Sequence, residues 1–258
     1  MDSATYLYCV VQAPNAPDVR RVRGGVPGAG RLRVHPAGRS LWIVVAPVPL
    51  EIYGEEALAN ALRDLKWVGR VAVAHEQVVE QFSHQRQSTV VPAKLFTMFS
   101  SDERAVEATR GQARRITALA SRIAGCEEWG VRITRQSRPV ERAPGRGERP
   151  QSGSAFLAAR KQARDKTREA LRTAGESALA AYETLGAIAR DVRRRDDVPD
   201  GAAAPPLLDA VFLVPALRRT QFKAAAKRLA ARGAAAGTQL TLSGPWPAYN
   251  FVQPGARQ

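Results

Sequence analysis

Residues Leu207–Trp246, LLDAVFLVPALRRTQFKAAAKRLAARGAAAGTQLTLSGPW, decide the fold class of this 258-residue chain. The stretch opens on the apolar, β-rich run LLDAVFLVP, which predicts a strand. LRRTQFKAAAKRLAARGAAAG then has a helical pattern that ends at a glycine, and TQLTLSGPW predicts a second strand. A strand, a helix and a strand in this order predict a sheet with a helix packed on it.

Three earlier segments extend this pattern. VVPAKLFTMF (residues 90–99) predicts a strand, and residues 100–125 predict a helix with a serine N-cap, an acidic first turn and an end at Gly125. CEEWGVRITR (residues 126–135) predicts the next strand. With the long helical region after it set aside, the order from Val90 to Trp246 is βαββαβ, which is the ferredoxin-like order.

The helical region at about 153–196 then counts as an insertion into this domain. Leu171, Ala178, Leu185 and Val192 recur every seven residues, which favours a protruding helix with a seam for another helix, including one from a second copy. The alternative is an amphipathic helix that packs on its own domain. The spacing alone does not separate the two.

The first third of the chain has a separate pattern. YLYCVV (residues 6–11) and LWIVVAPV (residues 41–48) predict strands, and residues 55–86 predict helices. We therefore expect an α+β protein with an N-terminal α/β domain at 1–88 and a ferredoxin-like domain at 89–258.

The net charge of +15 suggests anionic partners, but the basic residues form no single block and alternate with no aromatic stacking platform. Cys9 and Cys126 lie in separate apolar runs, which favours buried thiols in a reducing cytoplasm. The N-terminus has no signal-peptide pattern, and the longest apolar run, LWIVVAPVPL, is about half the ~20 residues of a membrane helix. We expect neither export nor a membrane span.

Sites for chemistry are absent from the sequence. His35, His75 and His84 lack metal-ligand spacing, and neither a nucleophile elbow nor a Walker loop occurs. Glu127 and Glu128 are adjacent on a predicted strand and would point to opposite faces. We therefore expect a protein that is not an enzyme, with no catalytic, cofactor-binding or metal-binding residues.

The segment LSGPWPAYNFV (residues 242–252) predicts a stiff, extended aromatic strap, because each proline disfavours helix. One reading makes its aromatic side chains an exposed patch that binds a partner. The other, which we favour, makes them a structural seal in which Trp246 is buried. The residues that define the strap are Gly244, Pro245, Trp246, Pro247, Tyr249 and Phe251.

These motifs together resemble the gas vesicle protein L/F family (GvpL/GvpF). The strap looks like the C-terminal signature of the family, and YLYCVV is similar to its first strand. AHEQVVEQF, GCEEWGVRI and SGSAFLAARK are similar to further stretches in the same order. PAKLFTMF (residues 92–99) is similar to the midpoint motif P-x-R-F-G-T-x-F, from which it departs at Lys94, Leu95 and Phe96.

The resemblance implies a minor gas vesicle protein that takes part in assembly and contacts the hydrophobic shell protein and other accessory proteins. It implies an N-terminal α/β domain, a ferredoxin-like C-terminal domain, a place with the gas vesicle in the cytoplasm, and neither catalysis nor a cofactor. Candidate partner contacts are Lys94, Phe96, Leu171, Ala178, Leu185 and Val192. The alternative from the residues is a nucleic-acid-binding regulator that uses the basic surface.

Overall fold

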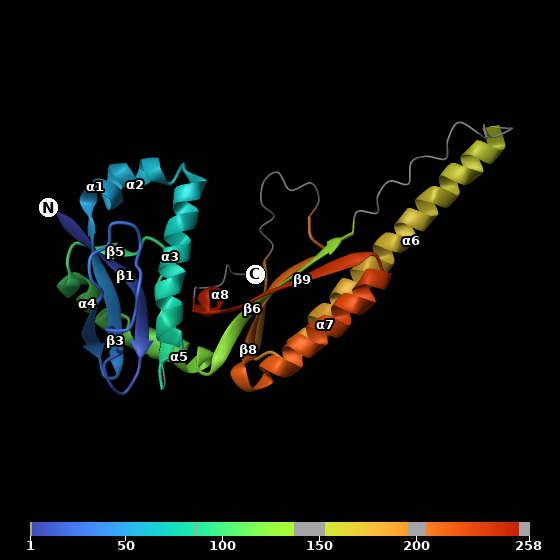
Figure 1. Cartoon of the computed structure of the whole chain (residues 1–258). Coiled ribbons are helices and arrows are strands. Elements are labelled where there is room, and N and C mark those ends of the chain that lie inside the picture. Colours follow the sequence, from blue (N-terminus) through green and yellow to red (C-terminus); the bar gives the residue numbers. More distant parts are fainter. Residues whose placement is uncertain (1, 86, 137–152, 196–204, 253–258) are drawn as a thin grey trace. The chain divides into compact units, whose positions relative to one another are not determined.

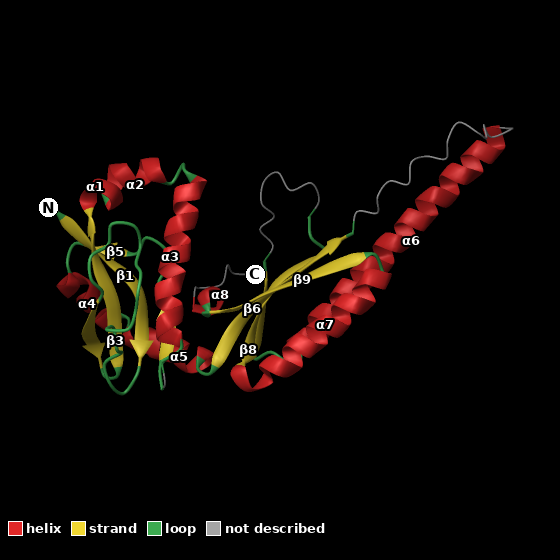
Figure 2. Ribbon diagram, in the orientation of Figure 1, coloured by secondary structure: helices red, strands yellow, loops and turns green. Residues whose placement is uncertain are grey.

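The computed structural model describes residues 2–85, 87–136, 153–195 and 205–252 (Figures 1 and 2). The chain divides into two compact units. The first unit consists of Met1–Glu127 together with Trp246–Gln258, and the second of Glu128–Pro245. Each unit has an antiparallel sheet with helices packed on it, so the mixed α and β composition expected from the sequence is observed.

The sheet of the first unit has the order β2-β3-β1-β4, and β5 also pairs with β1. The apolar run at residues 6–11 lies in the strand between β3 and β4. Helices cover both faces there, so side chains on both sides of this strand are buried, which explains why the run is continuously apolar. β1 pairs antiparallel with β3, β4 and β5, and β2 pairs antiparallel with β3. Its strands are β1 (Ser3–Gln12), β2 (Arg33–Gly38), β3 (Leu41–Pro49), β4 (Thr89–Pro92) and β5 (Met98–Phe99).

Helices cover both faces of this sheet. On one face α3 (Leu65–Ser83) buries Val71, Val78 and Phe82 against the central strand. On the other face lie α4 (Asp102–Gly111) and α5 (Ala113–Ile123). The short helices α1 (Leu50–Tyr53) and α2 (Glu55–Ala61) follow β3, and Tyr53 of α1 joins the same core as α3. The amphipathic spacing of α3 explains its placement, since its apolar positions lie on one side.

The second unit has four strands in the order β7-β8-β6-β9. Two helices pack on one face of this sheet, and their small apolar residues meet Phe212, Phe222 and Trp129 in the core. The elements are β6 (Cys126–Arg135), α6 (Gly153–Gly186), β7 (Asp191–Arg194), β8 (Leu208–Pro215), a 3-10 turn (Ala216–Arg218), α7 (Arg219–Ala235) and β9 (Thr238–Trp246).

This division differs from the boundary expected between residues 88 and 89. β4 and β5 pair with β1, so the segment after residue 88 completes the first unit. A βαββαβ order is present, but it consists of β6, α6, β7, β8, α7 and β9. Helix α6 is therefore one of its two helices, which corrects the expectation of an inserted helical region at about 153–196. Strand β7 escaped prediction because DVRR is mostly charged.

The heptad seam expected along α6 does not form a single surface. Ala178 and Leu185 are buried in the core of the second unit, and Val192 lies in β7. Leu171 is 42% exposed. Figure 1 shows α6 extending past the end of α7, and the described side chains from Ser154 to Thr173 are exposed. The C-terminal half of α6 is thus the amphipathic helix packed on its own domain.

The strap also differs from expectation. Trp246 is 41% exposed, and Tyr249–Val252 forms the short helix α8, so the segment is neither a Trp246-centred seal nor extended throughout. Phe251 is fully buried, and Tyr249 packs on the core of the first unit. β9 ends at Trp246, between Pro245 and Pro247, because proline cannot donate to a strand ladder. The segment from Trp246 onward belongs to the first unit, where Phe251 and Val252 of α8 are buried.

Candidate functional site

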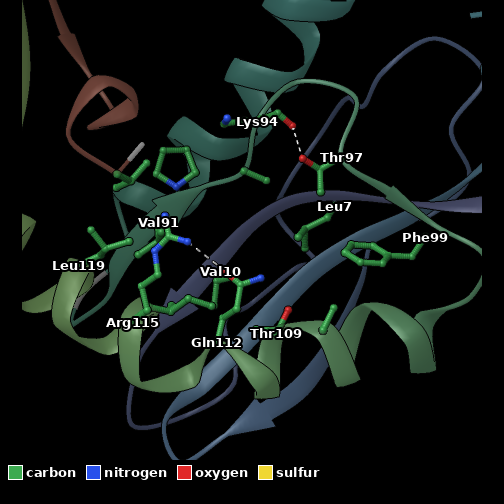
Figure 3. A pocket seen from close by; sticks show the side chains of 15 residues that line it. Leu7, Val10, Val91, Lys94, Thr97, Phe99, Thr109, Gln112, Arg115 and Leu119 are labelled. Atoms are coloured by element: carbon green, nitrogen blue, oxygen red, sulfur yellow. Dashed lines mark hydrogen bonds between the residues drawn. The ribbon is translucent and has the colours of Figure 1, made fainter. Parts of the chain in front are cut away.

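An apolar groove opens on the first unit, between the sheet and helices α4 and α5 (Figure 3). Its volume is about 360 Å³. Strands β1 and β4, the loop after β4, both helices and Val252 contribute to its walls. The residues that line it are Leu7, Val10, Val91, Pro92, Ala93, Lys94, Thr97, Phe99, Ala108, Thr109, Gln112, Arg115, Ile116, Leu119 and Val252.

A bulge in β1 places the floor of the groove. The register with β3 shifts between Leu7 and Cys9. In a regular strand Leu7 and Val10 would face opposite sides, but the bulge turns Tyr8 and Cys9 to the same core and leaves Leu7 and Val10 together on the other face. Leu7 and Val10, although three residues apart, thus both lie on the floor of the groove.

The loop after β4 forms a second wall. The backbone N–H of Ala93 donates to the carbonyl of Tyr8, and the N–H of Leu7 donates to the carbonyl of Thr97. The Thr97 hydroxyl donates to the Lys94 carbonyl at 2.7 Å, which closes the turn. These bonds fix Lys94 and Thr97 at the mouth, where Figure 3 shows them.

Phe96, from the same motif, faces away from the groove. Its φ of 62° lies in the left-handed region, and its ring stacks on Trp67 with centroids 5.7 Å apart. Its N–H donates to the Tyr6 hydroxyl at 3.3 Å. The midpoint motif that this chain resembles has glycine here, which is the residue that this conformation favours. Phe96 is therefore a packing residue of the first core.

The opposite wall is one face of the helical pair. Ser101 caps α4, and its hydroxyl accepts from the N–H of Arg104 at 3.3 Å. Thr109, Gln112, Ile116 and Leu119 follow at intervals of three and four and lie along the groove. Arg115 stands at the exposed rim and donates to Gln112 at 3.5 Å. The C-terminal α8 completes this end, held by a hydrogen bond from Arg122 to the Phe251 carbonyl.

The groove has an apolar floor and a polar, cationic rim. Val10 and Val91 form the floor, while Lys94 and Arg115 are exposed at the edge. Such a surface suits an apolar segment of a partner, since the floor accepts its side chains and the rim accepts its carbonyl or carboxylate groups. Among the described residues that line the groove, no two groups are arranged for acid–base or nucleophilic chemistry.

The titratable cluster of the first unit lies outside the groove. The Tyr6 hydroxyl and His75 Nδ1 are 2.9 Å apart, and the Tyr8 hydroxyl accepts from the N–H of Val26. Burial lowers the pKa of His75 to about 4 and raises the pKa of Tyr8 to about 12. All three groups are neutral at neutral pH and nearly inaccessible, so they stabilise the core.

Among the described residues, no three or more His, Cys, Asp or Glu side chains are grouped to hold a metal ion. His35 instead contacts Asp102 at 2.7 Å, and Asp102 also accepts from Thr5 and Arg33. This network ties β1 and β2 to the start of α4. No helix in the part of the chain that the structure describes is long and apolar enough to cross a membrane.

Of the candidate contacts from the sequence, Lys94 alone lines the groove. Leu171 is exposed on α6, whereas Phe96, Ala178, Leu185 and Val192 pack inside their own units. The wall formed by Thr109, Gln112, Ile116 and Leu119 was not predicted from the sequence. The signal in the sequence is the three- and four-residue spacing of this row, which places its members on one face of a helix.

The fold matches two solved structures along nearly the whole chain. The gas vesicle protein GvpF from Anabaena sp. PCC7120 has a TM-score of 0.66 at 17% identity, covering 99% of this chain and 98% of that one. GvpF from Microcystis aeruginosa has a TM-score of 0.63 at 14% identity, covering 97% and 99%. A sequence search against curated proteins found no match. The class defined by the fold is therefore the two-unit α+β fold of these gas vesicle proteins.

The family follows from the sequence match. The model of the gas vesicle synthesis protein GvpL/GvpF family matches residues 4–253. The chain belongs to this family, and its role is accordingly connected with gas vesicles. The resemblance inferred from the motifs is confirmed.

Proposed function

We propose that this chain is an assembly and minor structural protein of gas vesicles that binds the small hydrophobic shell subunit through the groove of the first unit. Family membership supports the vesicle role. The observation that carries the binding site is the open apolar groove, lined by part of the midpoint motif and by the last residue of α8. Concave, mostly apolar surfaces with a few polar groups at the rim are the usual place where proteins bind a ligand or a partner segment.

The energetics favour an apolar occupant. Burial of one leucine- or valine-sized side chain in the groove contributes roughly 1.5–3 kcal/mol. The groove has room for a few such side chains at about 360 Å³. Cover of this kind would keep an aggregation-prone segment out of water before it is added to the vesicle wall.

The cationic rim would fix the orientation of the bound segment. Lys94 and Arg115 stand at the mouth and would bind backbone carbonyls or acidic side chains beside the apolar segment. Within this proposal the chain works with other accessory vesicle proteins in the cytoplasm, and it needs no catalysis or cofactor. No observation in the structure favours the nucleic-acid alternative.

The second unit has a regular alternation of strands and helices. We propose that it is a ferredoxin-like domain, on the basis of its βαββαβ element order and its strand order β7-β8-β6-β9. The strand β7 pairs antiparallel with β8, as this topology requires.

The test is co-purification of the full-length chain with a co-expressed shell subunit. Leu119→Lys places a charge in the groove and should reduce the retained shell subunit by about tenfold. Arg115→Glu changes only the exposed rim and should weaken retention less. The matched control is Leu65→Lys, because Leu65 is 82% exposed on α3 and lies outside the groove.

Melting temperatures of all variants show whether the fold is kept. Equal retention by wild type, Leu119→Lys and Leu65→Lys would contradict the groove as the binding site. Absence of retention by the wild type itself would contradict the proposed function.

A further inference from the structure

Strand β9 forms an outer edge of the second sheet. In the order β7-β8-β6-β9 its one partner among the described residues is β6, so the backbone on its other side faces outward. Gln239, Thr241 and Ser243 are exposed. An open strand edge is a template for another strand.

The other outer strands carry the usual protection against such pairing. Three of the four residues of β7 are charged, β2 contains Arg33 and Pro36, and the short β4 ends at Pro92. Charged residues and prolines on edges discourage pairing with other chains. By contrast, the nine residues of β9 include no charged side chain, and its proline stands only near the end, at Pro245.

The core of the second unit is also incompletely covered along this edge. Leu240 and Leu242 from β9 and Leu229 from α7 pack on the core, but they are only partly buried. A strand added beside β9 would place alternate side chains on the same face as these leucines. Apolar side chains there would extend the core, so the edge suits a segment with apolar residues on one face.

The charge of the flanking helix decides between a partner and a second copy. Pairing of two β9 strands would bring two α7 helices together on one face of a continuous sheet, and their like charges would repel. Helix α7 carries no acidic residue, and its basic residues are Arg219, Lys223, Lys227, Arg228 and Arg232. The edge therefore favours a partner without excess positive charge.

We propose that β9 adds one strand from an extended, uncharged segment of the shell subunit to the second sheet. The site deepens the proposed function and rests on it. The backbone of Thr238–Ser243 supplies N–H donors and carbonyl acceptors, and Leu240 and Leu242 supply the apolar row. An unprotected edge of this kind would hold the added strand by backbone hydrogen bonds along one side.

Hydrogen exchange tests the pairing directly. The full-length chain is compared alone and in the complex purified with co-expressed shell subunit. Outward N–H groups of residues 238–243 should exchange fast in the free chain and several-fold more slowly in the complex. Unchanged exchange in the complex would overturn the proposal.

A variant pair gives a second readout. Thr241→Lys adds a charge to the exposed edge and should lower shell-subunit retention several-fold, with an unchanged melting temperature. Thr173→Lys makes the same change on the exposed part of α6 and should retain wild-type binding. Equal retention by both variants would overturn the edge site.

The outcomes separate this inference from the function on which it rests. If the wild type retains the shell subunit and Leu119→Lys does not, while β9 shows no protection, the function stands and the edge site fails. If the wild type retains no shell subunit, both fail. Protection of β9 in the chain alone, together with a dimer mass, would identify a second copy as the occupant and overturn the proposal.

Discussion

At the residue scale, Phe96 shows how side-chain packing holds a costly backbone conformation. A left-handed φ costs a residue other than glycine roughly 1–2 kcal/mol. At 62° Phe96 carries this cost, and its stacking on Trp67 offsets it. Glycine at this position would remove the strain, and alanine would not.

We therefore predict that Phe96→Ala destabilises the protein more than Phe96→Gly, by about 1 kcal/mol. Both variants lose the ring, but only glycine relaxes at positive φ. Chemical denaturation measures the difference. The control is Ala118→Gly on the exposed side of α5, where glycine should be the less stable residue by about 1 kcal/mol. The same order at both positions would contradict the account of Phe96.

His75 gives the first unit a defined pH dependence. Its pKa falls from 6.5 to about 4 because burial disfavours the charged form. Between these two pH values the unfolded chain binds more protons than the folded one. The contribution of neutral His75 to the free energy of unfolding is therefore fully present above about pH 6.5 and is lost as the pH falls toward 4.

The prediction compares the wild type with His75→Gln, which cannot titrate. The stability advantage of the wild type should shrink by roughly 1–3 kcal/mol between pH 7 and pH 4.5. Denaturation series at several pH values give this difference, and subtraction removes the carboxylates that both proteins share. A difference that does not change with pH would show that His75 accepts its proton as easily as in the unfolded chain.

At the element scale, α6 combines two environments in one helix. Up to Thr173 its described side chains are exposed, and from Ala174 onward Ala178, Ala181 and Leu185 enter the core. Its stability in the second half comes from packing on the sheet and on α7.

Two lysine substitutions on α6, one in each half, should distinguish the buried half of the helix from the exposed half. Leu185→Lys buries a charge without a partner in the core and should cost at least roughly 3–5 kcal/mol. Leu171→Lys should change stability by about 0.5 kcal/mol or less, because Leu171 is 42% exposed. Thermal melts of both variants check the pair, and similar losses would mean that the exposed half is also packed.

The same scale shows what the sequence can predict. Apolar runs such as residues 6–11 and 207–215 located strands that the structure contains. Which strands share a sheet could not be predicted in the same way, because the pairing of Val10 with Val91 is a long-range contact that leaves no local sequence pattern. The groove was missed for the same reason, since β1, β4 and α5 meet only in the folded unit. Trp246 was expected to be buried because tryptophan side chains usually are, but at the end of β9 it is 41% exposed.

At the scale of the whole molecule, the C-terminal segment connects the end of the second unit to the core of the first. Phe251 is fully buried in the first unit, while Trp246 is 41% exposed. We predict that Phe251→Ala costs about 3–5 kcal/mol and raises hydrogen exchange in the first unit, with little change in the second. Trp246→Ala is the matched control and should cost under about 1 kcal/mol. A larger loss of stability for Trp246→Ala than for Phe251→Ala would contradict this account and would show that Trp246 is the main packing residue of the segment.

The central claim concerns the whole molecule as well: the groove of the first unit holds a segment of the shell subunit. The most direct measurement is photo-crosslinking, with a photoreactive side chain at Leu119 inside the groove and, as control, at the exposed Leu65. Both proteins are expressed with the shell subunit and irradiated. The account predicts a covalent adduct with the shell subunit from position 119 and little or none from position 65. Equal adduct formation at both positions, or an adduct from position 65 alone, would contradict it.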